Sequence, residues 1–399
     1  ISEKELEGQT NSYIKVKSSL QALKDMALLY RNNLDIKVVG ITGSVGKTST
    51  KETISYVLNK KYKVLKTEGN FNNEIGLPLT VFRLRDDDEV AVLEMGISDF
   101  GEMDRLSKIA QPDISVITNI GLCHLENLKT RDGILKAKTE IFNNMKPDGI
   151  AILNGDDDKL ITVDEVNGKK PERFGINYKD GVYAKDIENL GLSGTKFVIS
   201  GLNCVDGCKD FEVTVPVPGH HMIYNALAAA CVGAALELTS AQIADGITDL
   251  KTISGRNNII KTSKYTLIDD CYNANPVSMK ASVDVLDMAI GRKVCILGNM
   301  YELGENEKNL HYDVGQYIGT KNIDVLITIG DLARHIAMGT DDYMETHFGS
   351  YDCEIHSFDD MEEFNMAYSS ILKDNDNILI KASHAMKFAD IVELLSKDN

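Results

Sequence analysis

The residues best suited to chemistry lie in a glycine-containing turn between an apolar run and a helix-like run. Val38–Thr42 has the composition of a buried strand, and Lys47–Asn59 has the pattern of a helix. Between them stand, in order, Gly43, Gly46, Lys47 and Thr48. Backbone N–H groups converge at such a helix N-terminus and bind phosphate, a lysine neutralises terminal phosphates, and a hydroxyl suits Mg²⁺. The turn therefore predicts a nucleotide phosphate loop made of Thr42, Gly43, Ser44, Val45, Gly46, Lys47, Thr48 and Ser49.

The strict form of this motif is not present, because it would require glycine where the chain has Ile41. The alternative interpretation is a glycine turn followed by a lysine that is there by chance. The strand-like run before the turn and the helix-like run after it favour the phosphate loop.

Three further side chains could contribute to a site at the same edge of the predicted sheet. Glu94 follows the apolar run Val90–Leu93, so we expect it at the carboxyl end of a strand, where open sheets bind ligands. His124 follows another predicted strand, and Lys138 lies on a predicted helix. From the residues alone, a solvated carboxylate, a structural histidine and a solvated lysine are the plain alternatives.

Strand-like and helix-like runs alternate along most of the chain, which predicts an α/β fold with mainly parallel sheets covered on both faces. A β-rich segment at about 160–217 and a break at Thr252–Asn258 interrupt the alternation. We therefore expect an N-terminal helix and linker at 1–36. A P-loop ATPase-like central domain with a β-rich flap should follow at 37–253, and a C-terminal Rossmann-like domain at 254–399.

Composition excludes several classes of partner. The net charge of −17, from 43 basic and 60 acidic residues, disfavours nucleic acids and anionic membranes. No apolar run approaches the roughly 20 residues of a membrane helix. The seven scattered cysteines indicate free thiols, and the lone pair Cys204 and Cys208 is poor support for zinc. We expect a cytoplasmic monomer with small-molecule substrates.

Several segments resemble the Mur ligase family in the same order along the chain. They are Thr42–Thr48, Thr67–Pro78, Glu94–Gly96, His124–Glu126, Lys136–Phe142, Pro218–His221, Asn225–Ala229, Ser254–Arg256 and Asp269–Pro276. The combination is most similar to the branch of the family that joins D-alanyl-D-alanine to UDP-MurNAc-tripeptide. The chain departs from the common pattern at Met222, Asn299 and His384.

The resemblance implies ATP-dependent peptide-bond formation in peptidoglycan precursor synthesis, through an acyl phosphate and with release of ADP and phosphate. It implies two Mg²⁺ ions, the first held by Thr48 and Glu94 and the second by His124 beside a carbamylated Lys138. Lys47, His124 and Lys138 would be catalytic.

The resemblance also implies which residues contact the substrates. Nucleotide contacts fall on Asn225, Arg256, Asp270 and Tyr272, in addition to the phosphate loop. Substrate contacts fall on Asn72, Asn73, Asn273 and Asn275. For each of these residues a turn or capping role is the plain alternative.

Two other functions are open at this point. One is another ligase of the same superfamily, such as a folylpolyglutamate synthetase. The other is a nucleotide-binding partner protein that is not a ligase. The family begins with a small domain that holds the UDP-sugar, and the phosphate loop here starts at Thr42. We therefore expect the chain to lack most of that domain.

Overall fold

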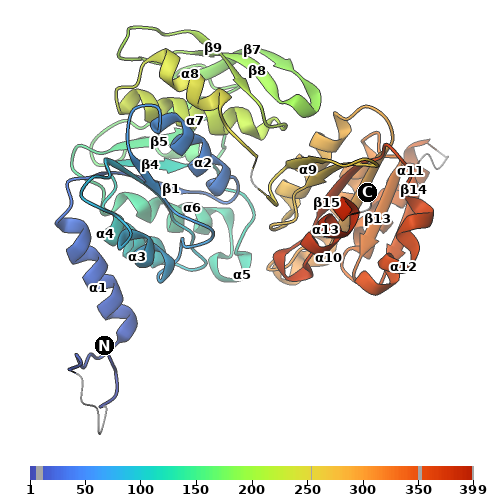
Figure 1. The fold of residues 1–399 in the computed structure, drawn as a ribbon, viewed down its shortest axis with the longest axis horizontal. Helices are drawn as coiled ribbons and strands as arrows, with labels where there is room; N and C mark the ends of the chain where they lie inside the picture. Colours follow the sequence, from blue (N-terminus) through green and yellow to red (C-terminus); the bar gives the residue numbers. More distant parts are fainter. Residues whose placement is uncertain (6–11, 253, 349–352, 398–399) are drawn as a thin grey trace.

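The computed structural model describes residues 1–5, 12–252, 254–348 and 353–397. Within these residues, one sheet has the strand order β2-β3-β1-β4-β5-β6-β7-β8-β9 and the other has the order β10-β11-β15-β12-β13-β14. Figure 1 shows the two sheets in separate bodies, the first coloured blue to yellow and the second orange to red. The predicted α/β fold class is confirmed.

The strands alternate with helices, as the sequence pattern predicts. The strands are β1 (Lys37–Thr42), β2 (Val64–Lys66), β3 (Val90–Glu94), β4 (Ile114–Ile117), β5 (Ile150–Asn154), β6 (Glu172–Gly175), β7 (Val182–Asn189), β8 (Thr195–Ser200), β9 (Phe211–Val215), β10 (Asn258–Lys261), β11 (Thr266–Asp269), β12 (Lys293–Gly298), β13 (Val325–Ile329), β14 (Glu354–Phe358) and β15 (Asn377–Lys381).

The helices cover both faces of the two sheets. They are α1 (Ser19–Asn32), α2 (Lys47–Leu58), α3 (Gly76–Val81), α4 (Glu102–Ala110), α5 (Leu125–Leu128), α6 (Arg131–Thr139), α7 (His221–Ala235), α8 (Ser240–Thr248), α9 (Pro276–Asp287), α10 (Glu307–Gly319), α11 (Arg334–Phe348), α12 (Met361–Ile371) and α13 (Ala389–Lys397). Short 3₁₀ helices lie at η1 (Glu140–Phe142), η2 (Leu160–Thr162), η3 (Gly191–Ser193), η4 (Gly304–Asn306) and η5 (His384–Met386).

Strand β1 is the centre of the first body. It pairs in parallel with β3 on one side and with β4 on the other. Val39 and Ile41 are buried in the hydrophobic cluster that includes α2, α7 and α8, whereas Val38 is buried in the cluster on the opposite face with α1, α4 and α6. Burial on both faces explains why this strand is a continuous apolar run rather than an alternating one.

The β-rich segment extends the main sheet. Strand β6 pairs in parallel with β5, β7 pairs in parallel with β6, and β8 and β9 continue as antiparallel strands. The predicted β-rich flap is therefore the far edge of the same sheet and shares its core, which includes Phe174 and Phe197.

The second sheet is parallel except for its edge strand β10, which forms an antiparallel pair with β11. Helices α9, α10 and α11 pack on one face and α12 and α13 on the other. This arrangement matches the predicted Rossmann-like pattern. In the part of the chain that the structure describes, no helix is long and apolar enough to cross a bilayer.

Helix α8 packs closely on α2, the helix that follows the phosphate loop. A Cβ atom at Gly246 would lie 2.4 Å from the Cα atom of Val57 and 2.9 Å from its backbone nitrogen. These are backbone atoms of α2, so only a shift of one helix could relieve the overlap. The absence of a side chain at Gly246 therefore sets how closely the two helices approach.

We predict that Gly246→Ala lowers the free energy of unfolding by about 1–3 kcal/mol, because the added methyl group overpacks a contact between α8 and α2 that has no free space. Urea unfolding at equilibrium measures the change. Asp245→Ala, at an exposed position of the same helix, is the matched control and should change stability by about 0.5 kcal/mol or less. Equal stability of the Gly246→Ala protein and the wild type would contradict the packing argument.

Candidate active site

The phosphate loop is held in shape by the segment that follows β4. The backbone N–H of Ser44 donates to the carbonyl of Asn119 (3.0 Å), and that of Val45 donates to the Asn119 side-chain oxygen (2.9 Å). Thr118 donates its hydroxyl hydrogen to the Val45 carbonyl (2.7 Å). The loop is therefore fixed by the residues that directly follow the neighbouring strand β4.

Both loop glycines are required by the backbone. Gly46 has φ = 81° and is the N-cap of α2. A Cβ atom at Gly43 would lie 1.9 Å from the hydroxyl oxygen of Thr118. Lys47 folds back over the loop, and its Nζ donates to the carbonyl of Gly43 (2.8 Å). The geometry is that of a phosphate-binding turn with its lysine at the rim.

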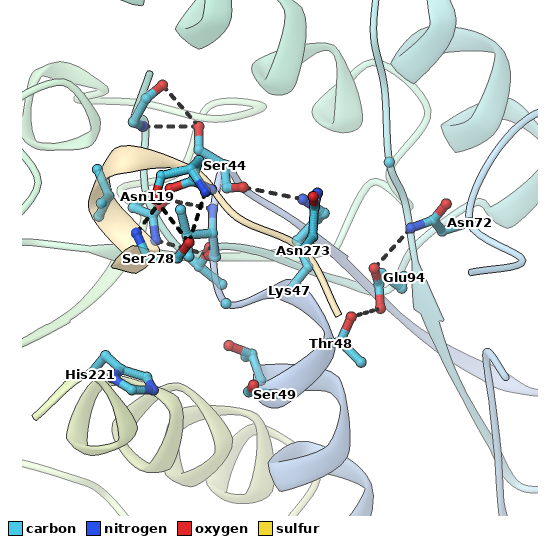
Figure 2. A pocket seen from close by; sticks show the side chains of 18 of the residues that line it. Ser44, Lys47, Thr48, Ser49, Asn72, Glu94, Asn119, His221, Asn273 and Ser278 are labelled. Atoms are coloured by element: carbon cyan, nitrogen blue, oxygen red, sulfur yellow. Dashed lines mark hydrogen bonds between the residues drawn. The ribbon is translucent and has the colours of Figure 1, made fainter. Parts of the chain in front are cut away.

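Glu94 lies at the end of β3, where the side chains of Thr48 and Asn72 are hydrogen-bonded to it (Figure 2). Its carboxylate accepts hydrogen bonds from the Thr48 hydroxyl (2.9 Å) and from the Asn72 amide (2.8 Å). The ammonium of Lys51, which is 1% exposed, lies 3.9 Å from the same carboxylate and donates to the Thr67 carbonyl (2.7 Å). Glu94 therefore joins the phosphate-loop helix to the loop at 67–76.

Lys138 is fully buried, and within the described residues its Nζ has no hydrogen-bond partner. Burial, reinforced by the charge of Lys47, lowers the pKa of Lys138 from 10.5 to about 7. Burial and the charges of Lys138 and Lys47 lower the pKa of His124 from 6.5 to about 4. His124 also has a positive φ of 50°. These three basic side chains therefore act on one another electrostatically, although they come from separate elements.

The second body contributes strand-end residues to the opposite side. The guanidinium of Arg256 lies 4.1 Å above the ring of Tyr272. Asp270 is paired with the buried ammonium of Lys381 (2.6 Å), which also donates to the carbonyl of Asn273 (2.9 Å). This pairing fixes the loop after β11 against the end of β15.

One cleft of about 1240 Å³ is lined by residues from both bodies. Most of the residues predicted for the site line it: Ser44, Val45, Gly46, Lys47, Thr48, Ser49, Asn72, Asn73, Glu94, His124, Asn225, Arg256, Asp270, Tyr272, Asn273 and Asn275. Thr42, Gly43 and Lys138 lie behind this lining, and Thr42 is fully buried with its hydroxyl unpartnered among the described residues.

Two of the predicted substrate residues also have local structural roles, one in a turn and one as a helix cap. The Asn73 side chain accepts hydrogen bonds from the N–H groups of Ile75 and Gly76, at the start of α3. Asn275 is the N-cap of α9 and forms a capping box with Ser278. The plain alternative for these two asparagines is thus observed, and substrate contact stays a prediction for them.

Sequence reasoning missed several residues that shape the cleft. Asn119 is hydrogen-bonded to the phosphate loop. The ammonium of Lys51 lies near Glu94, and that of Lys381 is paired with Asp270. Asn119 could have been found, because it follows β4 by two residues and so lies at the carboxyl edge of the sheet. Lys51 and Lys381 gave no such signal, because lysines on a helix and at a strand end are usually solvated.

Comparison with known proteins identifies both bodies. Residues 41–233 match the Mur ligase middle domain, and residues 255–384 match the Mur ligase, glutamate ligase domain. The chain is 37% identical to a UDP-N-acetylmuramoyl-tripeptide–D-alanyl-D-alanine ligase of Bacillus subtilis over 96% of this chain and 81% of the relative. It is 32% identical to the Escherichia coli ligase of the same name, over 96% and 82%. The chain belongs to the Mur ligase family.

Solved structures agree with the family assignment. MurF from Acinetobacter baumannii superimposes with a TM-score of 0.89 at 30% identity, covering 99% of this chain and 84% of that one. MurF from Thermotoga maritima in complex with ADP gives a TM-score of 0.85 at 30% identity, covering 99% and 87%. The predicted membership of the Mur ligase family is therefore confirmed, and the residue roles stay predictions.

We predict that burial of Lys138 makes this Mur ligase more stable as the pH rises from 7 to 9. Because the folded pKa is about 7 and the ordinary one is 10.5, the unfolded chain binds more protons than the folded chain in this window. Each pH unit then adds up to about 1.4 kcal/mol to the free energy of unfolding.

Lys138→Met removes the titrating group and keeps most of the side-chain volume, so the variant should lack this gain. Urea unfolding of both proteins at pH 7 and pH 9 in CO₂-free buffer measures it. At each pH, the free energy of unfolding of the variant is subtracted from that of the wild type, so that titrations shared by both proteins cancel. A difference that is the same at both pH values would refute the prediction.

Proposed function

We propose that this chain joins D-alanyl-D-alanine to UDP-MurNAc-tripeptide at the expense of ATP, in the synthesis of peptidoglycan precursors. The observation that carries the proposal is its similarity, over 96% of its length, to the Bacillus subtilis ligase that bears this name. The cleft supports it, because a phosphate loop and strand-end residues of a second α/β body face one another across a single space.

The ATP phosphates would lie along the phosphate loop, whose backbone N–H groups and Lys47 provide the positive side of the site. Asn225 would contact the adenine, while Arg256, Asp270 and Tyr272 would contact the nucleotide from the other body. The ADP-bound relative supports this use of a nucleotide.

The donor atoms present fit Mg²⁺. The Thr48 hydroxyl and the Glu94 carboxylate are already joined at 2.9 Å, and both are the oxygen ligands that this ion prefers. The described residues contain no group of three or more His, Cys, Asp and Glu side chains that could hold a metal alone. Phosphate oxygens would therefore complete the shell, with His124 at a second ion. Bound Mg²⁺ would neutralise charge on the transferred phosphoryl group.

Lys138 suits carbamylation. An amine must be uncharged to add to CO₂, and burial lowers the pKa of Lys138 to about 7. Its buried Nζ is unpartnered among the described residues, so an ammonium there is poorly solvated. A carbamate would convert a cation into an anion that orients His124 and the second Mg²⁺.

The reaction would proceed in two steps. The terminal carboxylate of the tripeptide attacks the γ-phosphorus of ATP, which releases ADP and forms an acyl phosphate. The ammonium of D-alanyl-D-alanine loses a proton to water, and the resulting amine attacks the acyl carbon. The C–O bond to phosphate breaks, phosphate leaves with the bonding electrons, and the nitrogen releases a second proton as the amide forms. Phosphoryl transfer of this kind depends on positioning and charge neutralisation, which Lys47 and the loop amides supply.

The domain division belongs to this proposal. The central domain at 37–253 would hold ATP and the C-terminal domain at 254–399 would close over it, with the segment 1–36 leading into the first. Monomeric state and cytoplasmic location stay predictions.

We predict that the wild-type chain releases ADP and phosphate only when the tripeptide nucleotide and D-alanyl-D-alanine are both supplied. Mass spectrometry should detect the pentapeptide nucleotide. Lys47→Ala should lower turnover by about 100-fold or more, since it removes a charge from the transition state, and should unfold at the wild-type temperature. Turnover with a folate and glutamate in place of these substrates would indicate the folylpolyglutamate synthetase alternative. No turnover with any amine would indicate a non-ligase partner protein.

We predict that Lys138→Ala loses ligase activity and that acetate or formate partly restores it, because a small carboxylate can take the place of the carbamate oxygens. Lys138→Arg is the control and should not be rescued, because its cation would remain in the site. Initial rates measured against increasing acetate concentration test this. Full activity of Lys138→Ala without added acid would show that the lysine is structural.

A further inference from the structure

Glu302 differs from the other acidic side chains of the cleft in having no bonded partner. It lies after β12 in the second body, lines the cleft and has a side chain that is 73% exposed. The ring of His124 in the first body faces it, with Nδ1 3.7 Å from the carboxylate, beyond hydrogen-bond distance. Among the described residues, no donor is hydrogen-bonded to Glu302.

The remaining acidic side chains that line the cleft are all engaged. Glu94 accepts two side-chain hydrogen bonds, Asp158 is paired with Arg131, and Asp270 is paired with Lys381. Hydrogen bonds are likewise accepted by Glu74, Glu102, Asp156 and Asp157. Within the described part of the cleft, Glu302 is therefore the carboxylate that is free to receive a ligand.

The backbone holds Glu302 in place at a conformational cost. Its φ is 63°, a left-handed value that is uncommon for a residue with a side chain. The preceding residues are fixed, because the Met300 N–H donates to the His311 ring (2.8 Å) and the Tyr301 N–H donates to the Ser383 hydroxyl (2.9 Å). Glycine would adopt this backbone conformation with less strain. The chain therefore carries a carboxylate at this position despite its conformational cost.

We propose that Glu302 binds the ammonium group of the incoming amine substrate and holds it near the acyl group, where the nitrogen loses a proton to water before it attacks. This inference rests on the proposed function and adds to it the residue that recognises the amine. The ammonium would enter a cleft edged by the cations Lys47 and Arg256, which repel it. A carboxylate opposite His124 offsets that repulsion and supplies a charge-assisted hydrogen bond.

Steady-state kinetics of Glu302→Gln test the proposal, because the amide keeps the shape and removes the charge. We expect KM for D-alanyl-D-alanine to rise by about 10-fold or more, with KM for ATP and for the tripeptide nucleotide within about 2-fold of wild type. The Mg²⁺ concentration for half-maximal rate should be unchanged. Glu305→Gln is the matched control, since it removes a carboxylate three residues away that is exposed but does not line the cleft.

Glu302→Gly separates recognition from folding. Loss of the strained side chain should leave the melting temperature equal to that of wild type or higher, while KM for the dipeptide rises as in the glutamine variant. An unchanged dipeptide KM in Glu302→Gln overturns the proposal. A shifted Mg²⁺ requirement, or equal losses for all three substrates, also overturns it and indicates a metal-binding or architectural role. Failure of the wild type to form any amide would instead refute the proposed function, and the inference with it.

Discussion

The contact between Thr48 and Glu94 is the interaction on which the rest of the site depends. It joins the first turn of α2 to the end of β3, and so fixes the phosphate loop relative to the neighbouring strand. Asn72 and Lys51 extend the contact to the loop at 67–76. In the strand order, β2 and β3 lie on one side of β1, and β4 and β5 lie on the other side. Open α/β sheets form ligand crevices where successive strands change sides in this way.

Electrostatics constrain the same region. Lys47 and His124 line the cleft and Lys138 lies behind its lining, so three basic groups lie in one region. Burial and the neighbouring positive charges lower the pKa of His124 and of Lys138. Such a cluster is unfavourable without anions. Phosphate, and a carboxylate or carbamate at Lys138, would neutralise it. The cluster of basic groups, which destabilises the folded chain by itself, is thus what an anionic ligand such as a nucleotide would require.

Much of the fold and part of the site could be predicted from the sequence. The buried parallel strands were visible as apolar runs, and the phosphate loop, Glu94 and His124 could be placed because each follows such a run. Strands such as β6 and β10 are harder to predict, because each has only four residues and their patterns resemble loops. The contact between Lys381 and Asp270 was out of reach for another reason: it joins residues 111 positions apart, through the pairing of β11 with β15. Substrate contacts at Asn73 and Asn275 stay open, since Asn73 stabilises the turn that leads into α3 and Asn275 caps α9.

The placement of the cleft at the carboxyl edges of two separate sheets has an evolutionary consequence. On the second body's side, the cleft is lined by the segment before β10, the loops after β11 and β12, helix α9 and the last residue of β15. The loops after β11 and β12 are anchored to their own sheet. Mutations there can change how the second body meets its ligands while the sheet that carries the phosphate loop keeps its own geometry. The architecture is therefore modular: the loops of one half of the chain can diverge while the phosphate loop and its supporting strands in the other half are inherited unchanged.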